Sequence, residues 1–402
     1  MIEALDTVAD DALNFSYKGA YTMDLQQIRD RIDEVDSGLI ALFRERMELS
    51  REVALYKEHN DLPILNKARE REVLLRVSRL AGEEMGAYAR MLFSNLFEMS
   101  RSYQQRLMTK SGALTELLHA AQMPVDATFP AAAVVACQGV EGAYSQLACD
   151  KLFAASDIMY FRTFEAVFQA VQSGLCEYGV LPIENSSSGS VNGVYDLLHK
   201  FEFSIVRSVR LHVNHFLMAK PGVKLADIKE ICSHEYALDQ CSNLFDQFPG
   251  VKVTAVKNTA IAAQTVAQSD RTDLACISSH DCAKLYNLSI LKEGVQNNAN
   301  NYTRFICIKR DPAIYPGANK ISLMLSVPHK PGSLYSMISK FSVLGLNLTK
   351  LESRPIWSSA FEFLFYLDLE ASVWSPAVME LLEELSQTNP HFAFLGSYSE
   401  IY

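Results

Sequence analysis

The chain has 402 residues and a formal net charge of -10 at pH 7, with 49% hydrophobic and 21% charged residues. This length exceeds one ordinary hydrophobic core, so about two to four domains are expected. The acidic balance argues against nucleic acid as a partner, because phosphate binding needs a basic surface. No apolar run reaches the roughly 18 residues of a membrane-spanning helix, so no membrane partner is expected either.

The first 21 residues and the cysteines indicate where the protein works. Residues 1–21 are acidic and lack the apolar segment of a signal peptide, so we expect an acidic leader and a cytoplasmic protein. All eight cysteines lie from Cys137 to Cys307 and none forms a Cys-x-x-Cys pair, which predicts buried, reduced thiols. The spacing of Cys232, His234 and Cys241 matches no zinc signature, and neither a metal nor a cofactor is expected.

The N-terminal part of the chain has the hydrophobic pattern of long helices. Apolar residues recur at helical spacing over residues 25–57, and further helices are predicted at 68–80 and 87–108. Residues 22–110 are therefore predicted to form an all-α domain. Its first helix is too long for its own neighbourhood to cover, so we expect it to pair with a second copy of the chain or with long neighbouring helices.

Polar side chains on these helices include the groups that a small dianion would need. Arg46 and Lys57 are eleven residues apart and share a helix face, whereas Arg29 is turned roughly 100° away. Arginine suits a carboxylate, and Lys with Gln can stabilise an oxygen that gains charge. Such charges alone are more often solvated helix surface. The complete set is Arg29, Arg46, Lys57, Asn66, Arg69, Glu70, Ser100 and Gln104.

This set resembles the all-α class of chorismate mutase, in which two chains interlock and share their sites. The resemblance implies that Arg46 and Arg69 of one chain bind the substrate carboxylates together with Arg29 of the other chain. It also implies that Lys57 and Gln104 stabilise the breaking ether oxygen. Conversion of chorismate to prephenate is a rearrangement that needs no nucleophile, because conformational restraint and electrostatic stabilisation suffice.

Three further positions follow from the same resemblance. It implies that Glu70 binds the ring hydroxyl and that Ser100 contacts the substrate. Asn66 stands where some members of the family have aspartate.

The central part of the chain alternates between strand and helix signals. Residues 111–131 lose periodicity and are predicted to be a linker, with room for one short helix. The alternation beyond them is typical of βαβ units and a largely parallel sheet. Two lobes joined by crossing strands would leave a cleft between them. Predicted strands lie at 132–137, 158–161, 178–181, 203–210, 212–218, 251–256 and 275–278, and near Ile231. The glycine-rich run 139–145 is no Gly-x-Gly-x-x-Gly, which argues against a nicotinamide cofactor.

Two polar segments of this region carry groups suited to chemistry. Glu184-Asn185-Ser186-Ser187-Ser188-Gly189 precedes a predicted helix and offers hydroxyls and backbone N–H groups to an anion, although a capped hydrophilic loop is the plainer interpretation. In the segment 300–305, the Thr303 hydroxyl can exchange a proton and the Arg304 guanidinium suits a carboxylate. A threonine in a strand is by itself an ordinary β-former.

These segments, together with Ser233-His234 and Gln240, resemble the motifs of prephenate dehydratase. The resemblance implies a two-lobed, periplasmic-binding-protein-like α/β domain over residues 132–310. It implies that Thr303 protonates the departing hydroxyl while the ring carboxylate leaves as carbon dioxide. No role is assigned to His234. The residues implied to bind prephenate are Glu184, Asn185, Ser186, Ser187, Ser233, Gln240 and Arg304.

The C-terminal part changes pattern again after a linker at 311–319. Residues 320–402 are predicted to follow the order βαββαβ of a ferredoxin-like fold. Segments 331–335 and 351–355 resemble the two motifs of the amino-acid-sensing ACT domain, although Ser333 and Tyr335 depart from the usual form. The resemblance implies phenylalanine as the effector, bound between two such domains. The implied effector residues are Gly332, Ser333, Leu334, Glu352, Ser353, Arg354 and Pro355.

The parts together predict a multidomain enzyme of phenylalanine biosynthesis. It would rearrange chorismate to prephenate, convert prephenate to phenylpyruvate, respond to phenylalanine and assemble as a dimer or tetramer. The alternative is a non-catalytic metabolite sensor whose helical domain only dimerises. A sensor need not keep Thr303, Lys57 and Gln104 together, so their joint presence favours the enzyme.

Overall fold

A computed structural model describes residues 24–108, 112–330, 332–355, 363–389 and 391–402. The predicted leader, residues 1–21, lies outside the described residues. The chain divides into two compact units, residues 1–109 and 110–402.

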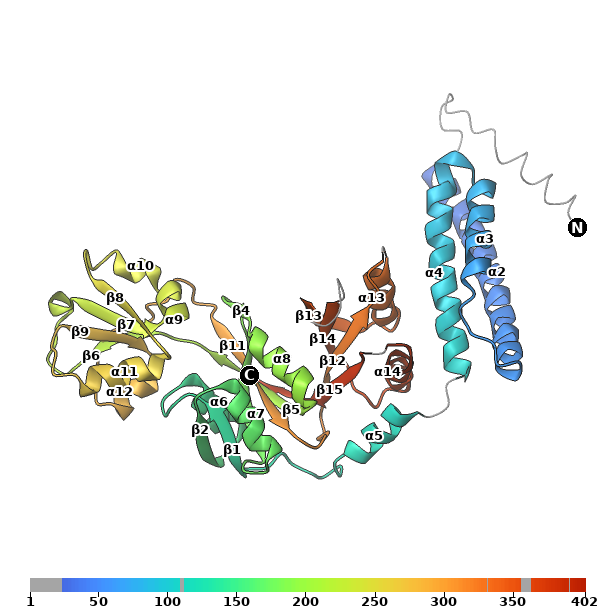
Figure 1. Cartoon of the computed structure of the whole chain (residues 1–402). Helices are drawn as coiled ribbons and strands as arrows, with labels where there is room; N and C mark the ends of the chain where they lie inside the picture. Colours follow the sequence, from blue (N-terminus) through green and yellow to red (C-terminus); the bar gives the residue numbers. More distant parts are fainter. Residues whose placement is uncertain (1–23, 109–111, 331, 356–362, 390) are drawn as a thin grey trace, which may run out of the picture. The chain divides into compact units, whose positions relative to one another are not determined.

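The described part of the first unit consists of three helices, as predicted (Figure 1). They are α2 (Leu25–His59), α3 (Lys67–Leu80) and α4 (Gly82–Met108). Asp24 begins α2 with a capping box, in which its carboxylate accepts from the Gln27 N–H at 2.9 Å and the Gln27 side chain accepts in return. Helix α4 begins earlier than predicted because Gly86 does not interrupt it. A Cβ on Gly86 would lie 3.0 Å from the Ser78 carbonyl of α3, so this glycine allows close helix packing.

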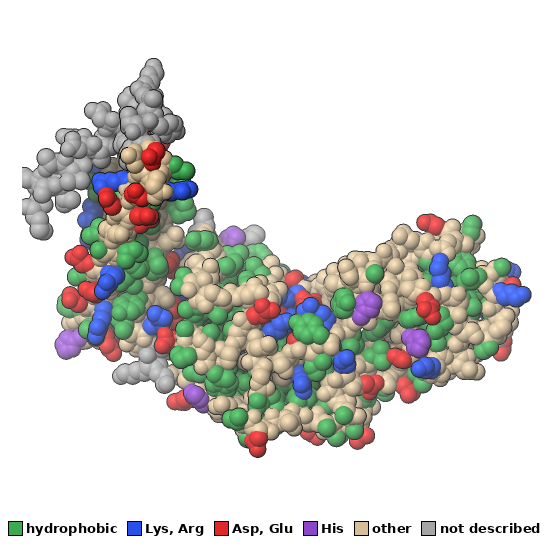
Figure 2. Space-filling view, turned by 180° about the vertical axis from the view of Figure 1, so that it is seen from behind, with side chains coloured by type: hydrophobic (Ala, Val, Ile, Leu, Met, Phe, Trp, Pro, Cys, Tyr) green, Lys and Arg blue, Asp and Glu red, His purple; other side chains and the backbone are tan. Residues whose placement is uncertain are grey.

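Helix α2 leaves most of its apolar side chains uncovered by its own unit. Only Ser50 and Ala54 are fully buried in this helix. Leu39, Ile40 and Leu42 are 55%, 60% and 65% exposed, and hydrophobic side chains lie among charged ones on the surface of the helical unit (Figure 2). Exposed apolar area on this scale marks an interaction surface. The apolar stripe of α2 therefore exceeds what a three-helix unit can bury.

The second unit contains a large mixed sheet in the order β16-β5-β11-β3-β1-β2, with β4 paired to β3. Strand β1 is parallel to β2 and β3, whereas β11 is antiparallel to both β3 and β5. The prediction of a largely parallel sheet is thus wrong for half of this sheet, because the chain returns from the second lobe through β11. The strands are β1 (Ala132–Gln138), β2 (Ala155–Phe161), β3 (Tyr178–Asn185), β4 (Gly189–Ser190), β5 (Ser204–His212), β11 (Tyr302–Lys309) and β16 (Glu400–Ile401). Helices α6 (Tyr144–Leu152), α7 (Phe164–Gln172) and α8 (Asn192–Phe201) connect them.

A second lobe is built on a smaller sheet in the order β10-β6-β9-β7-β8. Its strands are β6 (Phe216–Ala219), β7 (Glu230–His234), β8 (Lys252–Val256), β9 (Leu274–Ser278) and β10 (Ser289–Lys292), and its helices α9 (Glu235–Gln240), α10 (Ser242–Phe245), α11 (Thr259–Gln268) and α12 (His280–Leu285). Two lobes and two sheets confirm the predicted fold class (Figure 1). All eight cysteines are buried free thiols, as predicted.

The C-terminal domain is a four-stranded antiparallel sheet with two helices in the predicted order βαββαβ. Its elements are β12 (Lys320–Val327), α13 (Ser333–Val343), β13 (Asn347–Pro355), β14 (Phe363–Glu370), α14 (Pro376–Thr388) and β15 (Ala393–Tyr398). The strand order β13-β14-β12-β15 is that of a ferredoxin-like fold.

The predicted linker contains a helix that packs on this C-terminal domain. Helix α5 (Ala113–Ala121) places Leu118 and Ala121 in the same hydrophobic core as strands β12 and β14. The Glu383 carboxylate of α14 accepts from the Thr115 N–H at 2.9 Å and from its hydroxyl at 2.8 Å. A carboxylate at a helix N-terminus is stabilising. Part of the sequence between the predicted domains thus belongs to the C-terminal core.

The C-terminal domain contacts the large lobe through the backbone. Gly396 in β15 has a φ of +144°, and a Cβ on it would lie 2.1 Å from the Ile205 carbonyl oxygen of β5. Beyond it, β16 joins the edge of the large sheet in parallel with β5. The two domains therefore approach so closely at Gly396 that no side chain would fit between them.

We expect Gly396→Ala to destabilise the protein by about 2 kcal/mol or more, because the added methyl group overlaps a backbone oxygen at a strained φ. Urea unfolding followed by circular dichroism measures the change. Gly193→Ala in α8 is the matched control, since nothing lies within 4 Å of its added Cβ. Equal unfolding midpoints for the two variants would contradict the close approach.

Candidate active sites

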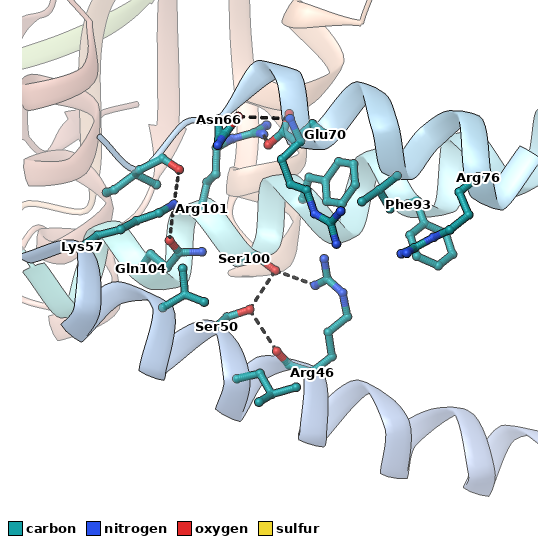
Figure 3. Close-up of a pocket in the computed structure, with 16 residues that line it drawn as sticks. Arg46, Ser50, Lys57, Asn66, Glu70, Arg76, Phe93, Ser100, Arg101 and Gln104 are labelled. Carbon is teal, nitrogen blue, oxygen red and sulfur yellow. Dashed lines mark hydrogen bonds and ion pairs between the residues drawn. The ribbon is translucent and has the colours of Figure 1, made fainter. Parts of the chain in front are cut away.

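A pocket of about 340 Å³ opens between the helices of the first unit (Figure 3). Its size is in the range of small-ligand sites. Five cations and a single carboxylate line it, so its potential suits a ligand with more than one negative charge. The charged lining residues are Arg46, Lys57, Arg69, Arg76, Arg101 and Glu70.

Partly buried polar contacts hold two of these cations in place. The Arg46 guanidinium donates to the Ser100 hydroxyl at 2.5 Å and to the Leu96 carbonyl at 3.3 Å. The Lys57 ammonium donates to the Ile64 carbonyl at 2.5 Å and to the Gln104 amide oxygen at 3.3 Å. Burial lowers the pKa of Arg46 and of Lys57, because it penalises their charged forms. An anionic ligand would offset that penalty.

The structure adds residues that the sequence did not single out. Ser50 is buried, donates to the Arg46 carbonyl at 2.9 Å and lies 3.2 Å from the Ser100 hydroxyl, while Phe93 and Phe97 supply an apolar wall. Arg101 forms ion pairs with Glu70 and with Glu98. Arg101 and Glu70 lie on different helices, and no local pattern indicates a contact across that separation.

Most of the predicted helical site residues line this one pocket. Arg69 is exposed and pairs with Glu72 at 2.7 Å, which leaves it at the rim. Asn66 caps α3 by accepting from the Arg69 N–H at 3.0 Å, a role that either Asn or Asp fills. Arg29 is exposed on α2 and is absent from the lining, in keeping with its predicted angular offset.

A second polar cluster lies where the two lobes of the second unit meet. The Asn185 side-chain NH₂ donates to the Asn301 amide oxygen at 2.7 Å and to the Thr303 hydroxyl oxygen at 2.9 Å. Its amide oxygen accepts from the backbone N–H groups of Ser187 and Ser188 at 2.9 Å and 2.8 Å. Because backbone N–H groups only donate, these contacts define the orientation of the Asn185 amide.

Gln240 extends the cluster into the second lobe. Its amide oxygen accepts from Asn301 at 2.8 Å, and its NH₂ donates to the Ser188 hydroxyl at 3.0 Å. The Gln240 oxygen must then accept from His215 Nε2, which lies 3.1 Å away. His215 therefore carries its proton on Nε2, and burial lowers its pKa, so the ring is neutral. Sequence reasoning missed both Asn301 and His215, although Asn301 stands two residues before Thr303.

Thr303 is the half-buried member of this cluster that can release a proton. Its oxygen accepts from Asn185, so its own O–H remains available as a donor. Ser186 secures the neighbouring backbone by accepting from the Tyr302 N–H and donating to the Asn300 carbonyl, both at 2.9 Å. The cluster thus holds one hydroxyl in a defined orientation between two lobes.

Three predicted substrate ligands, Ser233, Glu184 and Arg304, are placed differently. Ser233 is completely buried in β7 and donates to the Ile277 carbonyl at 2.6 Å, so it offers no exposed surface to a ligand in this structure. Arg304 is 4% exposed, and its guanidinium pairs with Glu184, Asp368 and Glu400 instead of facing the Thr303 cluster. The physical reason is strand alternation, which points the side chains of residues 303 and 304 to opposite faces of β11.

The predicted effector residues divide between two elements of the C-terminal domain. Gly332 has a φ of +86° and stands with Ser333 and Leu334 at the start of α13. In β13, the Glu352 carboxylate accepts from the Ser190 hydroxyl at 2.8 Å and Arg354 pairs with Asp196 at 2.8 Å. Ser353 and Pro355 are the exposed residues of this strand end. Two of the predicted effector residues thus contact the large lobe.

His234, to which the sequence analysis assigned no role, lies at the start of a helix. His234 occupies the N-cap position of α9 without a side-chain capping bond, and burial lowers its pKa.

Among the described residues, no helix combines the length and the apolar character that crossing a bilayer requires.

Comparison with known proteins identifies two families and a relative that spans nearly the whole chain. A prephenate dehydratase family model matches residues 135–313, and a chorismate mutase type II model matches residues 28–105. The bifunctional chorismate mutase/prephenate dehydratase of Escherichia coli K12 is 32% identical over 93% of this chain and 96% of its own.

Two further relatives match about two thirds of the chain. The arogenate dehydratase/prephenate dehydratase 1 of Arabidopsis thaliana is 39% identical over 66% of this chain and 71% of its own. The solved structure of a prephenate dehydratase from Arthrobacter aurescens in complex with L-Phe has 28% identity and a TM-score of 0.61, over 66% of this chain and 89% of that one.

We expect Asn185→Asp to destabilise the protein by about 1–3 kcal/mol, because Asn301 and Thr303 lose their donor and face a carboxylate. Thermal unfolding by calorimetry measures the change. The control Asn300→Asp introduces the same charge in the same region, at an exposed residue for which the structure gives no side-chain hydrogen bond. Equal losses in both variants would show that charge, and not the hydrogen bonds, is responsible.

Proposed function

The chain belongs to the family of bifunctional chorismate mutase/prephenate dehydratases, and we propose that its helical pocket is the mutase site and its Thr303 cluster the dehydratase site. The protein rearranges chorismate to prephenate and then dehydrates and decarboxylates prephenate to phenylpyruvate. The observation that carries the first assignment is a pocket with five cations and one carboxylate, which matches a dicarboxylate substrate.

The mutase step requires restraint and charge stabilisation in the helical pocket. Arg46 and Arg69 bind the two carboxylates and hold the substrate in its compact, reactive conformation. Lys57 and Gln104 donate to the ether oxygen, which gains negative charge as its bond breaks. Glu70, held by Arg101, accepts from the ring hydroxyl. No proton or nucleophile enters the reaction.

The mutase site is completed by a second copy of the chain. Support comes from the exposed apolar stripe of α2 and from Arg29, which lies on that helix outside the pocket lining of its own chain. Burying the stripe against a second copy would stabilise a dimer at about 25 cal/mol per Å² of apolar surface. In such a dimer Arg29 of one chain reaches the carboxylates in the pocket of the other. A dimer or a tetramer meets this requirement.

The dehydratase step requires one acid. Thr303 donates its proton to the departing hydroxyl of prephenate, which leaves as water when the carbon–oxygen bond breaks. The bond to the ring carboxylate breaks in the same elimination, carbon dioxide leaves, and its electron pair completes the aromatic ring. Thr303 regains a proton from solvent. Asn185, Ser187 and Gln240 orient the substrate, and the gain of aromaticity makes modest acid catalysis sufficient.

Regulation is assigned to the C-terminal domain, which we propose to be an ACT domain that binds phenylalanine between two copies. The relative from Arthrobacter aurescens was solved with L-Phe, which supports the same effector here. Gly332 at the start of α13 and Ser353 with Pro355 in β13 are the exposed candidates, and Ser333 and Leu334 are half-buried. A cytoplasmic location remains our prediction for this enzyme.

The alternative of a non-catalytic sensor loses its support. The relative that matches 93% of this chain is a bifunctional enzyme by name. Lys57 and Gln104 are held together by a hydrogen bond inside one pocket, and Thr303 and Asn185 by another inside the second cluster. A binding protein has no need of either pair.

Thr303→Ala is expected to lower the dehydratase kcat by about 10²–10³-fold, because the acid is lost, while the mutase rate stays at the wild-type value. Thr303→Ser keeps the hydroxyl and is expected to stay within about tenfold of wild type. Phenylpyruvate formation from prephenate and consumption of chorismate are measured in the same preparation. Loss of both activities in Thr303→Ala would mean that the two sites are not separate.

Arg29→Ala and Lys57→Ala are each expected to abolish most mutase activity, since each removes one part of every shared site. Mixed dimers of the two variants contain one site with both residues intact, so about a quarter of the wild-type rate should return on reassembly when chains pair at random. Chorismate consumption measures it. No recovery in the mixture, with exchange verified by mass spectrometry of tagged chains, would show that each chain uses its own Arg29.

A further inference from the structure

Arg304 stands next to the proposed acid Thr303 but is bound by groups of the C-terminal domain. Its guanidinium lies 2.6 Å from Asp368 of β14 and 3.0 Å from the Tyr398 hydroxyl at the end of β15. A third partner, Glu400, is 3.6 Å away in β16. The side chain of Arg304 is 5% exposed, so these contacts and not water satisfy its charge.

Two pairs of residues on neighbouring strands face in opposite directions. Strands β3 and β11 pair Thr303 with Asn185 and Arg304 with Glu184. The first pair is joined on one face by the Asn185–Thr303 hydrogen bond at 2.9 Å. The second pair is joined by the Arg304–Glu184 contact at 3.0 Å. Because successive side chains alternate across a strand, the first pair faces the substrate cluster and the second faces the C-terminal domain.

Strand β13 provides a second connection to the same place. The Lys350 ammonium donates to the Glu184 carboxylate at 2.6 Å and to the Ser190 hydroxyl at 2.9 Å. Glu352, two residues along β13, accepts from Ser190 at 2.8 Å. Lys350 and Glu352 share a strand face that is directed at β3 and β4, and Glu352 belongs to a proposed effector motif. A shift of β13 would therefore act on Glu184 directly.

The ion-pair network around Arg304 is buried, and its positive charges are matched by carboxylates. Asp368 accepts from the Ser322 hydroxyl at 2.5 Å, and Glu400 pairs with Lys320 at 2.7 Å, so each carboxylate around Arg304 has a second partner within the C-terminal domain. Removing one partner of a buried ion pair leaves an uncompensated charge and is costly. The network thus resists small displacements of β11 relative to β14.

We infer that Arg304 is a positioning residue that fastens the catalytic strands to the C-terminal domain, and that effector binding changes the dehydratase rate through Arg304 and Lys350. This inference rests on the proposed function. With the network intact, Thr303 and Asn185 keep the geometry that proton donation requires. An effector that favours another placement of β13 and β14 displaces Glu184 and Arg304, and the adjacent Asn185 and Thr303 move with them. Coupling of this kind needs only a difference in effector affinity between the two arrangements.

The test is Asp368→Asn, which keeps the side-chain shape and the oxygen that Ser322 donates to while removing the charge that binds Arg304. We expect the dehydratase kcat to fall about tenfold or more with KM for prephenate within about threefold, because geometry and not binding is lost. Half-inhibition should require at least about tenfold more phenylalanine. Mutase activity of the same chain should be unchanged because its pocket lies in the other unit, and circular dichroism reports correct folding of the second unit.

Asp196→Asn is the matched control. Asp196 and Arg354 also bridge the large lobe and the C-terminal domain, at 2.8 Å, but neither lies on β3 or β11. We expect it to retain the wild-type kcat. An equal loss of kcat in this control, or a wild-type kcat and wild-type inhibition in Asp368→Asn, would overturn the inference.

Lys350→Gln covers the case in which Asp368→Asn fails to fold, because Lys350 lies nearer the surface. It is expected to lower kcat about threefold and to weaken inhibition, again with KM unchanged; wild-type values for both would overturn the inference. Wild-type protein that does not act on prephenate would overturn the proposed function, and this inference with it. Active wild type with unaffected variants would overturn the inference alone.

Discussion

The antiparallel pairing of β11 with β3 is the interaction on which the second unit depends. It brings together two segments that are more than a hundred residues apart in the chain and places Asn185 opposite Thr303. The same ladder places Glu184 opposite Arg304 on the reverse face. One register therefore creates both a substrate-facing pair and a pair that holds the C-terminal domain. A slip by a single residue would exchange the two faces and abolish both.

The helical unit illustrates a different constraint, which is the shortage of partners for a long amphipathic helix. Helix α2 is 35 residues long, yet only two of them are buried by α3 and α4. The polar pocket nevertheless has its cations oriented by Ser100, Gln104 and backbone carbonyls. The unit thus supplies the inner wall of a site by itself, while the exposed stripe of α2 and Arg29 require a second chain.

The balance of charge differs between the helical pocket and the surroundings of Arg304. The helical pocket leaves several cations without a matching carboxylate, which suits a dianion that arrives with its own charge. Around Arg304 the carboxylates and cations are matched and buried, which leaves no net attraction for a ligand. The Thr303 cluster is built almost entirely from neutral amides and hydroxyls. An excess of positive charge therefore marks the helical pocket, and balanced charge marks the contact between Arg304 and the C-terminal domain. Neutral hydrogen bonds mark the site of proton donation.

The sequence by itself determined the helices, most strands, the order βαββαβ and the motifs, because these depend on hydrophobic periodicity and on residues close together in the chain. The sequence also places Thr303 and Arg304 at successive positions of one strand, and strand alternation alone predicts that their side chains point to opposite faces. Only the tertiary structure decided that Arg101 holds Glu70, that His215 supports Gln240, and that α5 belongs to the C-terminal core. These contacts join residues between about 25 and 270 positions apart. No local pattern records such pairs, because they arise from the packing of elements that are individually consistent with many arrangements.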